Sequence, residues 1–242
     1  MMPHQHPGLA PLIAVIGCDG SGKSTVSEAL LTWVQQWYSP AAAAHLGKQS
    51  GNIGRSIARL PLVGKLLERL IGRKTDNVRA QRERSAPGLF TAMVIVMFSL
   101  RRLRRFKRML ALRRQGLIIV TDRYPQLDLP GAYDGTGLSV RASGNAVLRW
   151  LARRERAAYE WMTSYRPDLV IRLNIDLDTA HARKPDHRYE LLRDKIAATP
   201  LLKFNGAPIA EVDAARPLAD VLAAAKAAVA ATLAARGYVQ RT

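Results

Sequence analysis

The chain has 242 residues, 48% of them hydrophobic, and its 37 Lys and Arg against 19 Asp and Glu give a net charge of +18. This length and apolar content suit one globular domain with its own core and argue against a disordered or fibrous protein. The single cysteine, Cys18, excludes an intramolecular disulfide and fits a reducing compartment. The charge favours polyanionic partners, which include nucleotides, nucleic acid and anionic lipid surfaces.

Targeting signals are not evident in the sequence. Residues 1–10 lack the basic start and apolar run of a signal peptide. The longest apolar stretch, residues 89–100, is too short to cross a bilayer as a helix, which takes about 20 residues. We therefore expect a soluble, cytoplasmic protein.

Strand and helix patterns alternate along the chain. Continuous apolar runs at residues 12–16, 117–121 and 169–174 are typical of buried parallel strands, and a shorter strand is predicted at 208–214. Helices are predicted at residues 24–38, 88–115, 145–165 and 217–236. The alternation predicts a single α/β domain over residues 1–242, with a central parallel sheet flanked by helices in three layers.

Residues 17–25, GCDGSGKST, match the Walker A pattern and lie between a predicted strand and a predicted helix. Glycines let backbone N–H groups surround phosphate oxygens, and the helix N-terminus adds the positive end of its dipole. This loop predicts the fold of P-loop NTPases. Lys23 should reach the β- and γ-phosphates, and Ser24 should ligate Mg²⁺. The predicted ATP-binding residues are Gly17, Cys18, Asp19, Gly20, Ser21, Gly22, Lys23, Ser24 and Thr25.

A second acidic group for the metal is predicted after the strand at residues 117–121, where Asp122, Arg123 and Tyr124 follow. Ligands of open parallel sheets bind beyond the carboxyl ends of the strands. Asp122 should therefore lie near Ser24 if the two strands are neighbours. The alternative is a capped strand end with a surface salt bridge.

Together these motifs resemble the thymidylate kinase family. IGCDGSGKST is similar to the bacterial form of that family's P-loop, and VTDRYP is similar to its DR(Y/F) motif. DLPGAYDG resembles the segment that lines the acceptor base, with Asp134 in place of an amide. Residues 173–190 resemble a strand followed by a basic LID at 178–190, and EVDAARPLADVL resembles the terminal strand, turn and helix near the adenine. The resemblance covers most of the chain.

The resemblance implies a role for particular residues. Asp19 would contact a sugar hydroxyl of the acceptor, Asp122 would hold Mg²⁺ through water, and Arg123 would bind phosphate. Arg101 matches the arginine that binds the acceptor phosphate. The LID would close over the transferring group, which needs alignment and charge neutralisation. The implied catalytic residues are Lys23, Asp122, Arg123, Arg183 and Arg188.

The sequence departs from the family around the acceptor. The REPG motif is absent between residues 41 and 55, where Lys48 is the nearest substitute for an acceptor contact. Met97 stands where the family stacks an aromatic ring on thymine. Residues 46–90 are a basic insertion in the acceptor-binding region. These departures do not affect the predicted phosphoryl transfer, but they leave the identity of the acceptor undetermined.

Eight Lys and Arg lie within residues 101–114 and cover several faces of the predicted helix. We interpret most of them as a solvated face, with a patch for polyanions or a membrane surface as the alternative.

Three functions follow from these readings. The first is an ATP- and Mg²⁺-dependent kinase of a nucleoside monophosphate. The second is a kinase of another small acceptor, such as a nucleoside or sugar. The third is a P-loop NTPase switch that binds nucleic acid or membrane. A small-molecule phosphate acceptor is the expected partner, and a homodimer is left open.

Overall fold

The computed structural model describes residues 8–47, 88–131, 133–138 and 146–241. Lys48 and most of the predicted basic insertion at 46–90 lie outside the described residues.

Five strands form one sheet in the order β2-β3-β1-β4-β5, and every neighbouring pair is parallel. The central strand β1 is buried along its whole length, as its continuous apolar sequence LIAVI predicts. The predicted parallel α/β sheet is confirmed. The strands are β1 (Leu12–Gly17), β2 (Ala41–His45), β3 (Ile118–Asp122), β4 (Leu169–Asn174) and β5 (Ile209–Asp213).

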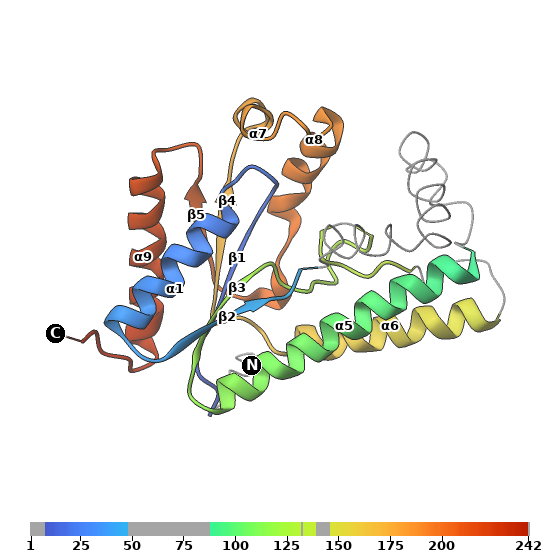
Figure 1. The fold of residues 1–242 in the computed structure, drawn as a ribbon, viewed down its shortest axis with the longest axis horizontal. Coiled ribbons are helices and arrows are strands. Elements are labelled where there is room, and N and C mark those ends of the chain that lie inside the picture. Colours follow the sequence, from blue (N-terminus) through green and yellow to red (C-terminus); the bar gives the residue numbers. More distant parts are fainter. Residues whose placement is uncertain (1–7, 48–87, 132, 139–145, 242) are drawn as a thin grey trace, which may run out of the picture.

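Helices cover both faces of the sheet, which gives the three predicted layers (Figure 1). Alternate residues of a strand point to opposite faces, so each face of β1 supplies its own core. Ile13 and Val15 pack with α1 and α9, whereas Leu12 and Ala14 pack with α5 and α6. The four helices are α1 (Lys23–Trp37), α5 (Leu89–Arg114), α6 (Ala146–Ser164) and α9 (Leu218–Ala235).

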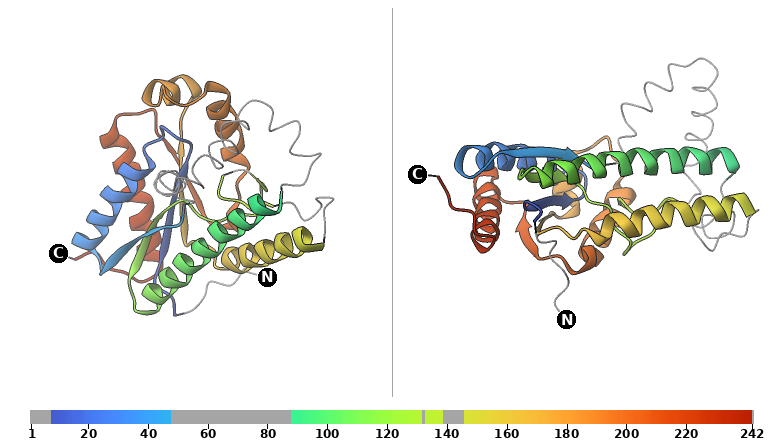
Figure 2. Two further views of the ribbon diagram at one scale, coloured as in Figure 1. Left: turned by 45° about the vertical axis from the view of Figure 1, so that its right-hand side comes forward. Right: turned by 90° about the horizontal axis from the view of Figure 1, so that it is seen from below.

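Helices α5 and α6 lie side by side and project beyond the sheet (Figures 1 and 2). Their contacts show that they run parallel. Ser99 on α5 donates to Glu155 on α6 at 2.7 Å, and one turn further along Arg102 donates to the Tyr159 hydroxyl at 3.0 Å. A separate apolar cluster, which includes Ala92 and Leu151, joins their outer ends.

Two short helices stand over the carboxyl ends of the strands, above the loop that joins β1 to α1 (Figure 1). They are α7 (Leu177–Arg183) and α8 (Tyr189–Ala198), followed by the short turns η1 (Thr199–Leu201) and η2 (Phe204–Gly206). The predicted LID at residues 178–190 corresponds to α7, its connection to α8 and the first residues of α8.

By length and composition alone, α9 is apolar enough to cross a membrane. Its Val221, Ala225, Val229 and Leu233 are buried against the sheet and α1. The buried residues lie on one side of α9, and 22% of the helix is buried.

Candidate active site

The loop between β1 and α1 has the backbone shape of a phosphate cradle. Gly20 and Gly22 have φ of 87° and 82°, a left-handed conformation that other residues rarely adopt. Gly22 precedes α1, whose N-terminus has no side-chain cap and no acidic residue in its first turn. Helix N-terminal N–H groups left in this state bind anions. The predicted strand, loop and helix context of the P-loop is confirmed.

Lys23 lies folded into the loop. Its Nζ donates to the Cys18 carbonyl, which also accepts from Ser21 Oγ at 2.9 Å. The Lys23 side chain is only 10% exposed and lies 4.0 Å from Asp19 Oδ1. Burial lowers the pKa of Lys23, and the neighbouring Asp19 carboxylate partly offsets that effect. A buried ammonium inside an anion cradle is placed to neutralise phosphate charge.

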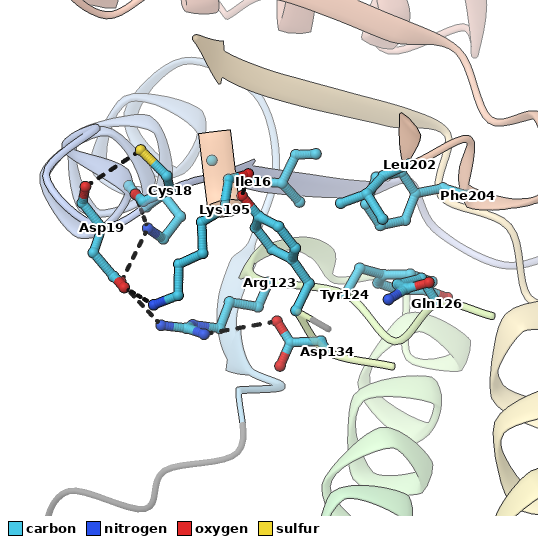
Figure 3. A pocket seen from close by; sticks show the side chains of 13 residues that line it. Ile16, Cys18, Asp19, Arg123, Tyr124, Gln126, Asp134, Lys195, Leu202 and Phe204 are labelled. Carbon is cyan, nitrogen blue, oxygen red and sulfur yellow. Dashed lines mark hydrogen bonds and ion pairs between the residues drawn. The ribbon is translucent and has the colours of Figure 1, made fainter. Parts of the chain in front are cut away.

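Three cations from separate parts of the chain converge on Asp19 (Figure 3). Lys195 on α8 donates to Asp19 Oδ2, and Arg123 Nη2 lies 3.7 Å from Asp19 Oδ1. Lys23 is the third. Burial alone would raise the pKa of Asp19, but the hydrogen bond and charge of Lys195, followed by the charges of Lys23 and Arg123, lower it. The cluster therefore holds one carboxylate and three cations, an excess of positive charge that suits an anionic ligand.

Arg123 connects this cluster to a second, buried ion pair (Figure 3). Its Nη1 lies 3.8 Å from Asp134 Oδ2, and the other Asp134 oxygen accepts from Arg102 on α5. The side chains of Arg102 and Asp134 are 1% and 6% exposed. Arg123 has a φ of 67°, which a residue with a side chain adopts only where its surroundings hold it. The two acids thus keep the Arg123 guanidinium beside the phosphate loop.

A cavity of about 170 Å³ opens between these groups. Tyr133 ties its wall to α8, because its hydroxyl bonds both the Lys195 carbonyl and Thr199 Oγ1. Burial raises the pKa of the Tyr133 hydroxyl, so it stays neutral. Charged groups line the end near the loop, and aromatic and aliphatic groups line the other end (Figure 3). The lining residues are Ile16, Gly17, Cys18, Asp19, Lys23, Arg123, Tyr124, Gln126, Tyr133, Asp134, Lys195, Leu202 and Phe204.

Comparison with known proteins places the chain in a family. No family model matches it. It is 43% identical over 223 residues to the uncharacterized ATP-binding protein YghS of Escherichia coli strain K12, which covers 92% of this chain and 93% of YghS. It is 42% identical over 228 residues to the uncharacterized ATP-binding protein YghR of the same strain, which covers 94% of this chain and 88% of YghR. The chain belongs to the YghS and YghR family. The names of both relatives refer to ATP binding and to no acceptor.

In this member of the YghS family, Asp122 ends the strand next to β1, where Val15 is its partner in register. The condition on which Asp122 was placed near Ser24, that the two strands are neighbours, is therefore met. Asp122 Oδ1 lies 3.0 Å from His45 Nδ1, at the end of β2, and Asp122 is not among the residues that line the cavity. Within the described residues, no group of three or more His, Cys, Asp or Glu could hold a metal. A magnesium ion here would therefore rely on the Ser24 hydroxyl, the Asp122 carboxylate, phosphate and water.

The two arginines predicted in the LID lie in different surroundings. Arg183 contacts the phosphate loop, since its Nη1 donates to the Ala214 carbonyl at 2.9 Å and approaches the Gly20 carbonyl at 3.4 Å. Arg188 stands at the N-cap position of α8, makes no side-chain capping hydrogen bond there, and is exposed. The structure thus brings one of the two to the P-loop.

The other predicted ligand-binding residues also separate. Arg101 is exposed on α5 and does not line the cavity, whereas its neighbour Arg102 reaches Asp134 at the cavity wall. Met97 is exposed and likewise absent from the lining. Ser24 and Thr25 are exposed on the first turn of α1. Cys18 is buried, which raises its thiol pKa and disfavours the reactive thiolate.

Several residues of the site have no counterpart in the sequence predictions. Lys195 and Phe204 line the cavity, and Lys195 binds Asp19 directly. Tyr133, in contrast, belongs to the segment DLPGAYDG, which resembles an acceptor-lining segment. The sequence carries one usable signal, because Lys195 follows Arg188, the N-cap residue of α8, by about two helical turns. Which side of α8 faces the phosphate loop is decided by tertiary packing, so the local sequence does not predict it.

Proposed function

We propose that this protein is an ATP- and Mg²⁺-dependent phosphotransferase that moves the γ-phosphoryl group of ATP to a small acceptor. The observation that carries the proposal is the convergence of Lys23, Arg123 and Lys195 on one carboxylate at the open N-terminus of α1. The relatives YghS and YghR, named as ATP-binding proteins, support ATP as the donor.

The charges of the site match the demands of phosphoryl transfer, in which alignment and charge neutralisation supply most of the catalysis. The loop N–H groups and Lys23 would bind the donor phosphates. Magnesium, held through Ser24 and Asp122, would neutralise phosphate charge. Arg123 and Lys195 would stabilise the negative charge of the transferring group from the acceptor side. Arg183 on α7 would keep the LID over the loop and exclude water.

The cavity supports an acceptor that has a ring and an anionic or hydroxyl end. Tyr124, Leu202 and Phe204 offer apolar surface, while Arg123 and Lys195 offer charge. A nucleoside monophosphate, as in thymidylate kinases, combines both properties and is the first acceptor that we propose. The cavity is smaller than the roughly 300 Å³ at which small-molecule pockets begin, so it would hold the reacting end of the acceptor.

A hydroxyl acceptor such as a nucleoside or sugar is the second candidate. Asp19 favours it, because the neighbouring cations keep its pKa low and its carboxylate ionised, although burial alone would raise that pKa. An ionised carboxylate can accept a hydrogen bond from a hydroxyl group and orient it toward the γ-phosphate.

ADP release, measured with ATP, Mg²⁺ and a panel of nucleoside monophosphates, nucleosides and sugars, tests the proposal. At least one acceptor should raise ADP formation well above basal hydrolysis. A nucleoside diphosphate product would identify the first acceptor class, and a monophosphate the second. If no acceptor stimulates ADP release, the protein is not a phosphotransferase of these classes.

Lys23→Ala should lower phosphoryl transfer by roughly 10³-fold, because one preorganised charge on the transferring group is lost. Lys226→Ala is the matched control, since Lys226 lies on α9 over the Trp33 ring and away from the loop. Unchanged turnover in Lys23→Ala would reject the phosphate loop as the donor site.

A further inference from the structure

The outer half of α5 exposes large apolar side chains. Leu89, Phe90, Met93, Met97 and Leu100 are between 44% and 56% exposed. Single exposed apolar residues are ordinary in soluble proteins, but five within three turns of one helix form a continuous patch. Such patches mark surfaces that bind a partner.

The exposed apolar residues share a helix face with exposed cations. Leu89, Met93 and Met97 recur every four residues, and Arg104 and Arg108 continue the same stripe toward the sheet. The opposite side of α5 is buried against α6 and the sheet. We call this face the α5 outer face. It consists of Leu89, Phe90, Met93, Met97, Leu100, Arg101, Arg104 and Arg108.

Helices α5 and α6 carry many more basic than acidic residues. Helix α5 contains eight Lys and Arg and no Asp or Glu. Its partner α6 adds four Arg against Glu155 and Glu160, of which Glu155 is buried. Twelve cations and two acids on adjacent helices account for more than half of the net charge of +18. The potential over these helices is therefore strongly positive.

We propose that the α5 outer face docks on an anionic membrane surface. Helices that lie in a membrane interface place Leu, Phe and Met at the acyl boundary and Lys and Arg among the anionic headgroups. Arginine side chains suit this position, because the apolar stem stays at the boundary while the guanidinium reaches the phosphates. Helix α5 projects beyond the sheet together with α6, so its outer half lies away from the strands and from the described helices other than α6 (Figures 1 and 2).

The apolar half of the face favours lipid over nucleic acid as the occupant. Nucleic acid is held by phosphate contacts that Lys and Arg make, and such contacts have no use for a stripe of Leu and Met. A lipid interface uses both halves, since the charges attract the protein to the surface and the apolar groups insert.

Co-sedimentation with lipid vesicles tests the docking surface. The protein should bind vesicles of phosphatidylcholine containing phosphatidylglycerol, should bind pure phosphatidylcholine weakly, and should be released by salt. The double variant Leu89→Ser, Met93→Ser should bind roughly tenfold more weakly. Arg104→Gln with Arg108→Gln should weaken binding about fivefold for each charge removed. All four side chains are exposed and outside the cavity, so folding and ADP release should be unchanged.

Matched controls use exposed residues far from α5. Leu218→Ser removes an apolar side chain that is 51% exposed on α9, and Arg216→Gln removes a cation whose side chain is 62% exposed. Both should bind vesicles as the parent protein does. Equal loss in the controls and the α5 variants would reject a localised surface.

Three further results would overturn the proposal. One is equal binding to vesicles with and without phosphatidylglycerol. Another is salt-sensitive binding to DNA or RNA that persists in the serine double variant while vesicle binding is absent. The third is a dimer in light scattering that the serine double variant converts to monomer, which would assign the face to a second copy of the chain. Each result is independent of whether the protein transfers phosphate.

Discussion

The phosphate loop and the α5 outer face use the same cationic residue types in opposite ways. Around the loop, Lys23, Arg123 and Lys195 are each held in place by Asp19. On α5 the cations lie on a helix that has no acidic residue. A cation held by a neighbouring carboxylate is preorganised for one ligand geometry. A row of exposed cations attracts any polyanion, and this attraction weakens as the salt concentration rises. A cation that lies beside an acidic residue therefore belongs to a defined binding site, whereas a cation without one contributes to the general positive potential of the surface.

Two arginines of α5 offer the largest contrast between these regions. Arg102→Met should lower the free energy of unfolding by about 3–5 kcal/mol, because it leaves the buried Asp134 carboxylate without its main partner. Arg104→Met, two residues along and exposed, should change the unfolding free energy by less than about 0.5 kcal/mol. Urea denaturation of both variants measures the difference. Equal urea midpoints for the two variants would show that the buried pair of Arg102 and Asp134 contributes no more to stability than an exposed arginine does.

Glycine substitutions test how tightly α7 packs on the loop. Gly20→Ala and Gly237→Ala both place a side chain at positive φ, which costs about 1–2 kcal/mol. Only the Cβ at position 20 would also meet the Ala180 backbone oxygen, at 2.8 Å. Gly20→Ala should therefore lose about 1 kcal/mol more in thermal unfolding and should also bind ATP more weakly. An ATP affinity equal to that of Gly237→Ala would mean that α7 can move away without consequence.

Lys195 tests whether a cation from α8 serves the reaction. Lys195→Met should lower kcat/KM by roughly tenfold or more, because it removes a charge beside the transferring group. Lys184→Met, an exposed lysine that ends α7, is the control and should leave kcat/KM unchanged. Steady-state kinetics with the best acceptor of the panel distinguish the two. An equal loss of kcat/KM in both variants would mean that Lys195 acts only through the overall positive charge of the protein.

The smallest expected effect is in acid solution. The folded-state pKa of Asp19 lies below its ordinary value of 3.8, so the unfolded chain binds the proton more readily. The ion pairs of Asp19 therefore stabilise the fold above that value, and the contribution is lost as the pH falls through the lower, folded pKa. The parent protein should lose more unfolding free energy than Asp19→Asn from about pH 5 downward. Parallel curves for the two proteins would contradict the ion pairing.

Most of the fold could be predicted from the sequence. Strands β1, β3 and β4 coincide with the predicted apolar runs to within one residue at each end, because strands buried on both faces are apolar throughout. Strand β2 was not predicted. Its sequence AAAAH has low strand propensity, and its pairing with β3 at the edge of the sheet decides its structure. Helices α7 and α8 were likewise not predicted within their polar, basic segment.

The candidate site could be predicted only in its local part. The loop Gly17 to Thr25 carries its geometry in its own glycines and helix start, and its shape is as predicted. Counting along α5 led to Arg101, but one residue is a rotation of 100°, and it is Arg102 that reaches Asp134. Lys195 was missed because its approach to Asp19 spans 176 residues of sequence. Contacts between residues so far apart produce no regular spacing in the sequence from which they could be predicted.

The parallel course of α5 and α6 has an electrostatic consequence of its own. Helix dipoles cancel in antiparallel pairs and add in parallel ones, so the outer end of this pair carries about half a positive charge from each backbone. Neither helix has an acidic residue in its first turn to compensate. Glu155 is buried between them in the middle of α6, where it accepts from Ser99 and from the Gly137 and Leu138 N–H groups, so it lies beyond the first turn in which the dipole charge acts.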